Sequence, residues 1–350
     1  MSSPLARRLI VVTGKGGTGK TTVTAALGLL AARRGRRVVL VEMSGQRRLP
    51  ALLASGKEMT DGPAGEALAP GAAAEVELGE GLWSTSIDPD QALLDWLAVV
   101  GGRVPARLLA SRSSFRYFAA AAPGAKELLS LVRVWELTER ERWQGRGGGY
   151  DLAILDAPAT GHALAMLRSP STFGAIARVG PIAAQARRVG QLLADPARSA
   201  YIATSLASEA AVSETLELAE ALRADPGREL DRVVVNGVFS RRFSRAELDR
   251  VRGLDAAAEG DPAAGAMRAV LEAADFVEQR SRRQRSQLAR LRRAHMPTVL
   301  VPFAFTPRLD RAAVENIAKR LERALEEGSP NPRPGASPSP ATASQGPSAS

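Results

Sequence analysis

Eight consecutive residues near the N-terminus have the composition of a phosphate-binding loop. Residues 14–21 read GKGGTGKT, a glycine followed by four residues and then Gly-Lys-Thr. Glycines let successive backbone N–H groups turn inward around a phosphate, while the lysine reaches the β- and γ-phosphates and the last hydroxyl binds Mg²⁺. The residues expected to bind ATP here are Gly14, Lys15, Gly16, Gly17, Thr18, Gly19, Lys20, Thr21 and Thr22.

A carboxylate follows an apolar run near the middle of the chain. Residues 150–162 read YDLAILDAPATGH, in which residues 152–155 have the character of a buried strand and Asp156 follows directly. A carboxylate at the carboxyl edge of a parallel sheet faces the phosphate loop and can hold Mg²⁺ through a water molecule. We therefore expect Thr21 and Asp156 to hold the metal.

Lys15, the second residue of the loop, is not required by an ordinary phosphate loop. The form KGGTGKT resembles the deviant phosphate loop of MinD, ParA, the nitrogenase iron protein and ArsA. In that group the extra lysine contacts phosphates of a nucleotide that a partner subunit holds. The resemblance implies a dimer closed around two nucleotides, with Lys15, Lys20 and Asp156 as catalytic residues.

The segment after Asp156 selects among these relatives. DAPATGHALAMLRSP is similar to the switch segment DxAPTGHTLRLL of the ArsA family, which includes arsenite-pump ATPases and targeting factors for tail-anchored membrane proteins. The match covers Asp156, Thr160, Gly161 and His162, with Pro158 one residue earlier than in the family pattern. The resemblance implies a loop through His162 that relays the nucleotide state to a helical client or partner surface. Without the motif, His162 is an ordinary loop histidine.

Two further strand ends resemble the part of the family that holds the base. Asn236 follows an apolar run, and its amide can pair with the N6 and N7 pattern of adenine. Guanine-specific relatives use a lysine and a carboxylate after this asparagine, which are absent here, so ATP is favoured over GTP. Pro302 lies in a run that resembles the loop packed on the base. On local grounds alone, Asn236 is also compatible with a turn before Gly237.

One position departs from the family pattern. In many ArsA-family members the second strand runs into Thr-Asp-Pro-Ala-His, whose aspartate orients the attacking water. Ser44 stands at that switch position here, and a serine cannot act as a general base at neutral pH. Glu42, two residues earlier on the same strand face, is a tentative catalytic substitute that would act through a water. We expect ATP binding and leave fast hydrolysis open.

Three functions follow from these residues. The first is a Mg²⁺-dependent switch ATPase that works as a dimer. The second is a weakly active ATP-binding regulatory subunit of a heterodimer, in which a paralogous ATPase supplies the missing group. The third is a ParA-like DNA-binding ATPase. It is suggested by residues 276–293, which hold seven arginines and one glutamate and so contribute +6 to the net charge of +10. That stretch is also compatible with a solvated helix face or with a surface for phosphate or lipid headgroups, and we expect no specific nucleic acid.

The chain contains no cysteine and only five lysines among its 47 basic residues. Without cysteine, neither the thiolate-bound metalloid of the arsenite pumps nor the CxxC zinc clamp of the eukaryotic-type targeting factors is possible. The expected cofactors are ATP and Mg²⁺. No apolar stretch approaches the roughly 20 residues that span a membrane, and the N-terminus lacks the apolar core of a signal peptide, so we expect a cytoplasmic protein.

Short β-branched runs alternate with helical patterns and must position these residues. Apolar runs buried on both faces are typical of parallel strands covered by helices. A helix over residues 21–34, ended by Gly35, should follow the phosphate loop, and a capping box at residues 244–247 opens another. The pattern predicts an α/β fold of the P-loop NTPase class, with a mostly parallel doubly wound sheet. The expected strands are residues 9–12, 38–41, 82–87, 152–155, 200–203, 233–235 and 298–301.

Residues 1–328 are expected to form one ATPase domain. Residues 90–144 and 163–193 look helical but lie between strands, so they predict an inserted helical layer beside the sheet. The apolar side chains of this layer form either its own core or a client surface. Residues 51–81 are rich in alanine and glycine and are expected to be loop-like in their later part. Residues 329–350 contain six prolines and no large apolar side chain, which predicts a disordered tail.

Overall fold

The computed structural model describes most of the chain. The described residues are 3–43, 47–53, 75–100, 124–139, 149–176, 179–240, 246–247, 249–250, 253, 264–306 and 309–326. Several sequence-based expectations therefore fall wholly or partly outside it. They are the switch position Ser44, the capping serine at position 244, the tail from residue 329 onward, residues 101–123 and 140–144 of the expected helical layer, and residues 54–74 of the expected loop-like region.

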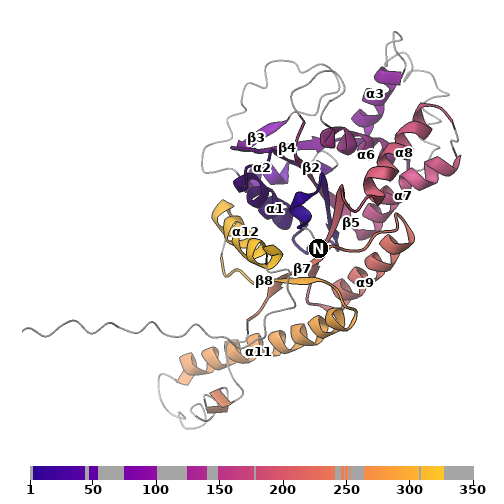
Figure 1. Cartoon of the computed structure of the whole chain (residues 1–350). Coiled ribbons are helices and arrows are strands. Elements are labelled where there is room, and N and C mark those ends of the chain that lie inside the picture. Colours follow the sequence, from indigo (N-terminus) through magenta and orange to yellow (C-terminus); the bar gives the residue numbers. More distant parts are fainter. Residues whose placement is uncertain are drawn as a thin grey trace, which may run out of the picture.

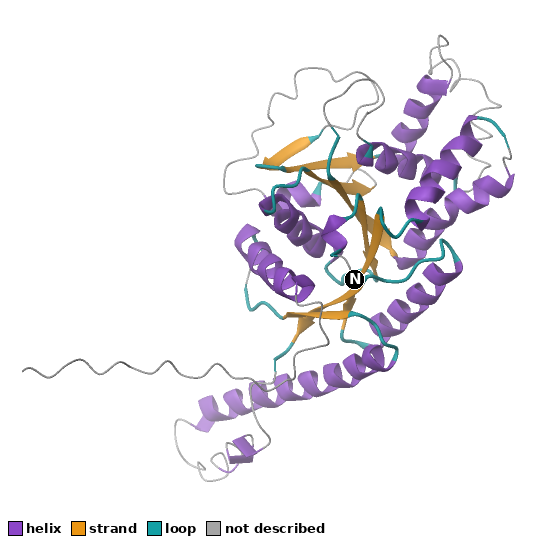
Figure 2. Cartoon of the chain, viewed as in Figure 1, coloured by secondary structure: helices purple, strands orange, loops and turns teal. Residues whose placement is uncertain are grey.

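One eight-stranded sheet forms the centre of the described part (Figure 2). Its order is β3-β4-β2-β5-β1-β6-β7-β8, and every neighbouring pair is parallel except β3 and β4. The α/β class and the mostly parallel sheet are thus confirmed. The strands are β1 (Leu9–Gly14), β2 (Val38–Met43), β3 (Val76–Gly79), β4 (Leu82–Ile87), β5 (Leu152–Ala159), β6 (Ser199–Leu206), β7 (Arg232–Val238) and β8 (Thr298–Pro302).

Strand β3 was not predicted, because the sequence indicated a loop in this region. It has only four residues, Val76–Gly79, and its first two side chains are exposed. A short strand at a sheet edge needs no continuous apolar run, so it lacks the pattern by which the buried strands are recognised. It pairs antiparallel with β4 and ends the sheet on that side.

Side chains of the central strands alternate between two cores. In β1, Leu9 and Val11 pack into one cluster, while Ile10 and Val12 pack into the other, and all four are fully buried. Burial on both faces explains why these strands are continuously apolar. The residues of β1 that follow are therefore held rigidly where the phosphate loop begins.

Helices cover both faces of the sheet (Figure 1). The Ile10 face is covered by α1 (Lys20–Arg33), α2 (Arg48–Leu53) and α12 (Arg311–Glu326). The Leu9 face is covered by α6 (Ala125–Thr138), α7 (Thr160–Ile176), α8 (Pro181–Ala194) and α9 (Glu209–Ala224). A single 3₁₀ turn, Pro4–Ala6, precedes β1.

The described parts of the expected helical layer are indeed helical. They comprise α3 (Pro89–Val100), α6, α7 and α8, and α6 packs against each of the other three. Figure 1 shows these helices gathered on one side of the sheet. Leu129, Val132 and Met166 from this layer join the core of the sheet. The layer is therefore continuous with the sheet core, while the domain limits drawn from the sequence stay a prediction.

The arginine-rich stretch lies in one long helix, α11 (Ala264–Arg293), which runs along the end of the molecule near β7 and β8 (Figure 1). Leu288 and Leu291, near its C-terminus, are buried in the core of the Leu9 face. Phe276 is 61% exposed. The helix was expected over residues 276–293 and begins twelve residues earlier. None of the helices among the described residues has the length and apolarity needed to cross a bilayer.

Helix α12 provides a test of the packing on the Ile10 face. Leu321 is 1% exposed and lies in the core that α12 shares with α1. Leu321→Ala leaves a cavity there, so we expect the free energy of unfolding to fall by about 2–5 kcal/mol. Arg320→Ala, at the exposed neighbouring position, should change it by less than about 0.5 kcal/mol. Urea denaturation of both variants measures the difference, and equal effects would contradict the packing described.

Candidate functional site

Four strands end at one edge of the sheet and bring the predicted residues together. The phosphate loop follows β1, Glu42 lies near the end of β2, Asp156 lies in β5, and Asn236 lies in β7. In the sheet register, Asp156 is opposite both Val12 and Glu42. Carboxyl ends of parallel strands are where α/β proteins bind ligands. The sheet order alone therefore places the loop beside two carboxylates.

The phosphate loop is held against β6 by close contacts. A Cβ atom at Gly14 would overlap the backbone carbonyl of Thr204, so no larger residue fits there. The Thr18 hydroxyl donates to the carbonyl of Lys15 over 2.8 Å and lies 2.8 Å from the buried hydroxyl of Thr204. Gly19 has a φ of 94°, a conformation that favours glycine. These contacts fix the curvature of the loop before any ligand binds.

Lys20 begins helix α1 and folds back over the loop. Its Nζ donates to the carbonyl oxygens of Gly14 at 3.1 Å and Lys15 at 3.2 Å. Burial lowers the pKa of Lys20, an effect that the negative charge of Asp156 opposes. A phosphate oxygen is a stronger partner for an ammonium group than a carbonyl oxygen is, because the bond is charge-assisted on both sides. The lysine is thus placed to exchange these bonds for phosphate contacts.

The two residues expected to hold Mg²⁺ contact each other directly. The Thr21 hydroxyl donates to Oδ2 of Asp156 over 2.6 Å. Oδ1 of Asp156 is buried and has no hydrogen-bond partner in the structure. Burial raises the pKa of Asp156, although the hydrogen bond from Thr21 and the charge of Lys20 oppose the shift. An unsatisfied carboxylate oxygen beside a hydroxyl fits the oxygen ligands that Mg²⁺ takes in nucleotide sites.

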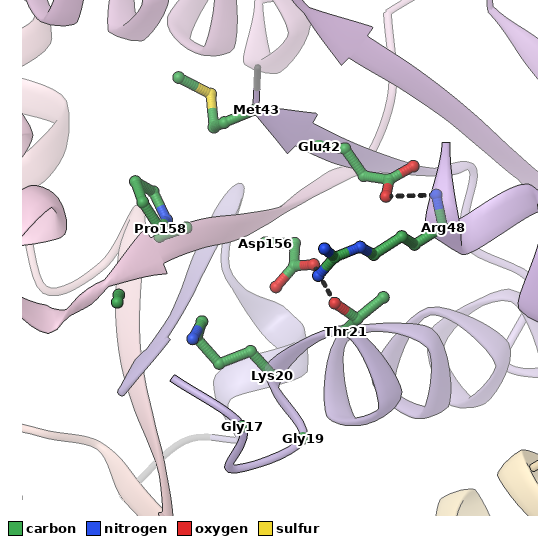
Figure 3. A pocket seen from close by; sticks show the side chains of 11 residues that line it. Gly17, Gly19, Lys20, Thr21, Glu42, Met43, Arg48, Asp156 and Pro158 are labelled. Carbon is green, nitrogen blue, oxygen red and sulfur yellow. Dashed lines mark hydrogen bonds between the residues drawn. The ribbon is translucent and has the colours of Figure 1, made fainter. Parts of the chain in front are cut away.

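These groups line a cavity of about 430 Å³ (Figure 3). In the figure, Lys20 rises from the loop on one side, while Glu42 and Arg48 lie on the other and Asp156 lies between them. Two cations and two carboxylates therefore face one space. The lining residues are Gly17, Gly19, Lys20, Thr21, Glu42, Met43, Arg48, Asp156, Ala157, Pro158 and Ala159.

Glu42, the tentative catalytic residue, already accepts two backbone hydrogen bonds. The side chain is 3% exposed, and Oε1 accepts the backbone N–H groups of Arg48 at 2.8 Å and Leu49 at 3.2 Å. Burial raises the pKa of Glu42, which these backbone bonds oppose. Glu42 thus fastens the start of α2 to the end of β2. Its predicted role in positioning a water stays a prediction.

The switch segment differs from the loop that was expected. Strand β5 continues through Pro158 to Ala159, and α7 starts at the next residue, Thr160. Thr160 is buried, whereas Gly161 and His162 are exposed in the first turn of the helix. No loop separates strand from helix, because the strand hydrogen-bonding extends past the aspartate to Ala159, opposite Gly14. The expected loop through His162 was therefore wrong as local structure.

The residues expected at the base lie beside the phosphate loop and on the neighbouring strand. The Asn236 side-chain amide donates to the carbonyl of Thr18 over 3.1 Å, and its oxygen accepts from Gly237 N–H. Pro302 is the last residue of β8 and is opposite Val238 of β7. Next to it, the ring of Phe303 stacks on that of Phe239 with centroids 4.9 Å apart.

Lys15, whose role was expected in a partner subunit, forms an ion pair within its own chain. Its Nζ lies 2.7 Å from Oε2 of Glu214 on α9. Burial by itself raises the pKa of Glu214, but the hydrogen bond from Lys15, together with other neighbours, outweighs burial and lowers the pKa. The lysine side chain is 45% exposed. It therefore lies at the surface, outside the residues that line the cavity.

Sequence reasoning missed Arg48, Glu214 and Thr204. Glu214 and Thr204 lie about 200 positions from the loop they contact, so no local spacing signals them. Arg48 lies only six residues after Glu42, in the run QRRLP that follows the second strand. Its position just after a strand, at the carboxyl edge of the sheet, could have marked Arg48 as a candidate site residue. The neighbouring Arg47 has the same property, however, so the sequence does not tell which of the two faces the site.

The chain is similar to a set of known ATPases. The family described as anion-transporting ATPase matches residues 7–179. The chain is 30% identical over 269 residues to ATPase BagA of Mycobacterium tuberculosis, which covers 75% of this chain and 73% of that protein. It is 30% identical to ATPase GET3 of Chaetomium globosum over 51% of this chain and 47% of that protein. It is 28% identical to ATPase GET3 of Podospora anserina over 47% of this chain and 44% of that protein.

The half-buried carboxylate of Asp156 predicts a pH-dependent cost in stability. Because its pKa is raised in the folded protein, its charged form destabilises the fold above that pKa. We expect Asp156→Asn to raise the melting temperature of the nucleotide-free protein at pH 7. The gain should shrink as the pH falls through the folded pKa toward the ordinary aspartate value, because the carboxyl of the folded protein then becomes neutral.

Thermal unfolding between pH 4 and pH 7 measures this effect. Glu220→Gln, on the exposed face of α9, is the matched control for the loss of one negative charge. It should show no such pH-dependent gain. An Asp156→Asn protein that is less stable than the control at pH 7 would show that the charged form is stabilised by its neighbours instead.

Proposed function

The chain belongs to the family of anion-transporting ATPases, the ArsA family, and from this we propose that it is a Mg²⁺-dependent switch that binds and hydrolyses ATP as a dimer. The observation that carries the proposal is the meeting of Lys20, Thr21 and Asp156 in one cavity at the end of the phosphate loop. These are the three side chains that phosphoryl transfer in this class of site requires.

ATP binding would replace hydrogen bonds within the phosphate loop by bonds to the phosphate groups. The Lys20 ammonium would leave the carbonyl oxygens of Gly14 and Lys15 for phosphate oxygens, and the backbone N–H groups of residues 16–21 would face the phosphate chain. The Thr21 hydroxyl and the free Oδ1 of Asp156 would hold Mg²⁺, the latter through water. The metal, when bound, neutralises charge that develops on the phosphate oxygens.

Adenine would be recognised at the side of the loop. The Asn236 amide has a second N–H and a carbonyl lone pair beyond the two bonds described, which suits the N6 and N7 edge of adenine. Pro302 and the ring of Phe303 follow on the neighbouring strand end and offer an apolar surface for the base. We therefore assign ATP as the nucleotide.

Dimer closure would require Lys15 to change partners. Its ion pair with Glu214 is partly exposed, and such pairs contribute only about 0.2–1 kcal/mol. A triphosphate on a facing subunit carries several negative charges and would compete readily for the ammonium group. We therefore propose that the pair with Glu214 forms in the open state and is broken when a second subunit closes over the nucleotide.

Closure would reach the helical layer through β5 and α7. Asp156 lies in β5, and Thr160 begins α7 without an intervening loop. Helix α7 packs on α6 and α8, so a displacement of the strand end at the nucleotide is passed to the layer as a movement of a rigid helix. Gly161, His162 and the layer form the part of the molecule that would meet a client or partner.

A second candidate is a regulatory subunit that binds ATP but turns it over slowly. It is favoured by Ser44 at the position of the water-orienting aspartate. A heterodimer with a paralogous ATPase would then supply that group. An ATPase assay of the chain alone and mixed with such a paralogue separates the two candidates, because turnover by the chain alone excludes the regulatory role.

Lys20→Ala tests nucleotide binding and hydrolysis. We expect Mg²⁺ and ATP to raise the melting temperature of the wild type but not of this variant, and turnover to fall by at least about 10²-fold. Lys319→Ala, on the exposed face of α12, removes the same charge and should behave as the wild type. If ATP protects neither the wild type nor the control, the proposed function is wrong.

Lys15→Ala tests the dimer separately. We expect this variant to bind ATP in the monomer but to lose ATP-dependent dimerisation, measured by analytical ultracentrifugation with ATP and with ADP. Glu214→Ala releases Lys15 from its own chain and should dimerise at an ATP concentration equal to or below that of the wild type. Lys126→Ala is the charge control. Dimerisation of Lys15→Ala at the wild-type ATP concentration would rule out the transfer of Lys15 between subunits.

A further inference from the structure

Arg48 stands at the cavity from the side opposite the phosphate loop. It is the first residue of α2 and lines the cavity together with Lys20, Thr21 and Asp156. Figure 3 shows its side chain extending across the space toward Asp156 and Thr21. Among the described residues that line the cavity, it is the one that carries a guanidinium group.

The backbone of Arg48 is fixed, while its side chain is available. Glu42 accepts hydrogen bonds from the backbone N–H groups of Arg48 and Leu49, and Leu49 and Pro50 of α2 are buried. Within the described part of the chain, the Arg48 guanidinium forms no hydrogen bond or ion pair. Buried carboxylates next to an arginine ordinarily form such bonds. A fixed backbone that carries a guanidinium group without protein partners is the arrangement expected of a residue that binds a ligand.

The charge of Arg48 acts on the other three ionisable groups that line the cavity. Burial raises the pKa of Asp156 and of Glu42, and the positive charge of Arg48 is among the effects that oppose it. The same charge adds to the burial that lowers the pKa of Lys20. Lys20 and Arg48 place positive charge on opposite walls of the cavity, so a phosphate group between them would be attracted by both.

We propose that Arg48 is a catalytic residue that contacts the γ-phosphate of ATP within its own subunit. This deepens the proposed function and rests on it. The guanidinium fork matches two phosphate oxygens, whereas a lysine offers a single point charge. Lys20 would thus hold the β,γ side of the phosphate chain and Arg48 the γ-phosphate from the opposite wall.

In the proposed hydrolysis, Arg48 takes no part in proton transfer. The oxygen of a water molecule forms a bond to the γ-phosphorus while the bond from that phosphorus to the β,γ-bridging oxygen breaks. The products are ADP and inorganic phosphate, and the proton from water passes to phosphate or solvent. Arg48 stays protonated throughout and stabilises negative charge on the γ-phosphate oxygens, a role that needs no carboxylate at position 44.

Arg48→Ala and Arg47→Ala form a matched pair. Arg47 is exposed, precedes α2 and does not line the cavity, so its removal changes the net charge equally. Affinities for ATP and ADP with Mg²⁺ are measured by calorimetry, and turnover by phosphate release. ADP lacks the group that Arg48 contacts, so ADP affinity serves as the check that the site is intact. Thermal unfolding without nucleotide checks the fold of both variants.

We expect Arg48→Ala to bind ADP as the wild type does, to lose about tenfold in its preference for ATP over ADP, and to lose at least about 10²-fold in turnover. Arg47→Ala should match the wild type in all three. Arg48→Lys should recover part of the ATP preference through its charge, but little of the turnover, because it lacks the fork.

Two results would overturn the assignment. If Arg48→Ala has the same ATP preference and turnover as Arg47→Ala, then Arg48 does not contact the γ-phosphate. An equal loss of ATP and ADP affinity would place its effect on the shared part of the nucleotide or on the fold. Failure of the wild type to bind either nucleotide is a different result, since it refutes the proposed function and this assignment together.

Discussion

The hydrogen bond between the Thr21 hydroxyl and Asp156 is the interaction on which the site depends. It joins the first turn of α1 to strand β5, and it is possible only because β5 lies directly beside β1 in the sheet. The register that brings Asp156 opposite Val12 also brings Glu42 opposite Asp156 from the other side. One half-buried carboxylate therefore connects the phosphate loop, the centre of the sheet and the end of β2.

Charge is balanced around that carboxylate by groups from separate elements. Lys20 and Arg48 face Asp156 and Glu42, and each acidic group is destabilised by burial. Such a cluster is a poor way to gain stability, because its acidic groups lose part of their contact with water. It is instead typical of a site arranged for a charged ligand. The cost is carried by the apolar packing of β1 and β5, which are buried on both faces.

The periodic parts of the fold could be predicted from the sequence, and the irregular parts could not. The apolar runs of β1, β2 and β5 are recognisable because burial on both faces leaves no polar position. Strand β3 was missed because two of its four residues are exposed at the sheet edge. A loop through His162 was expected because the resemblance to the ArsA-family switch segment implied one, yet the sheet pairing carries the strand to Ala159 and α7 follows immediately.

By itself, the sequence determined the phosphate loop, the aspartate that follows an apolar run, and the exclusion of thiolate chemistry, because each depends on residue types at fixed local spacing or on composition. The tertiary structure alone decided that Glu214 holds Lys15, that Thr204 supports the loop, and that Arg48 rather than Arg47 faces the cavity. These contacts follow from strand order, register and the orientation of α2. Such properties arise from long-range packing, which no spacing along the chain encodes.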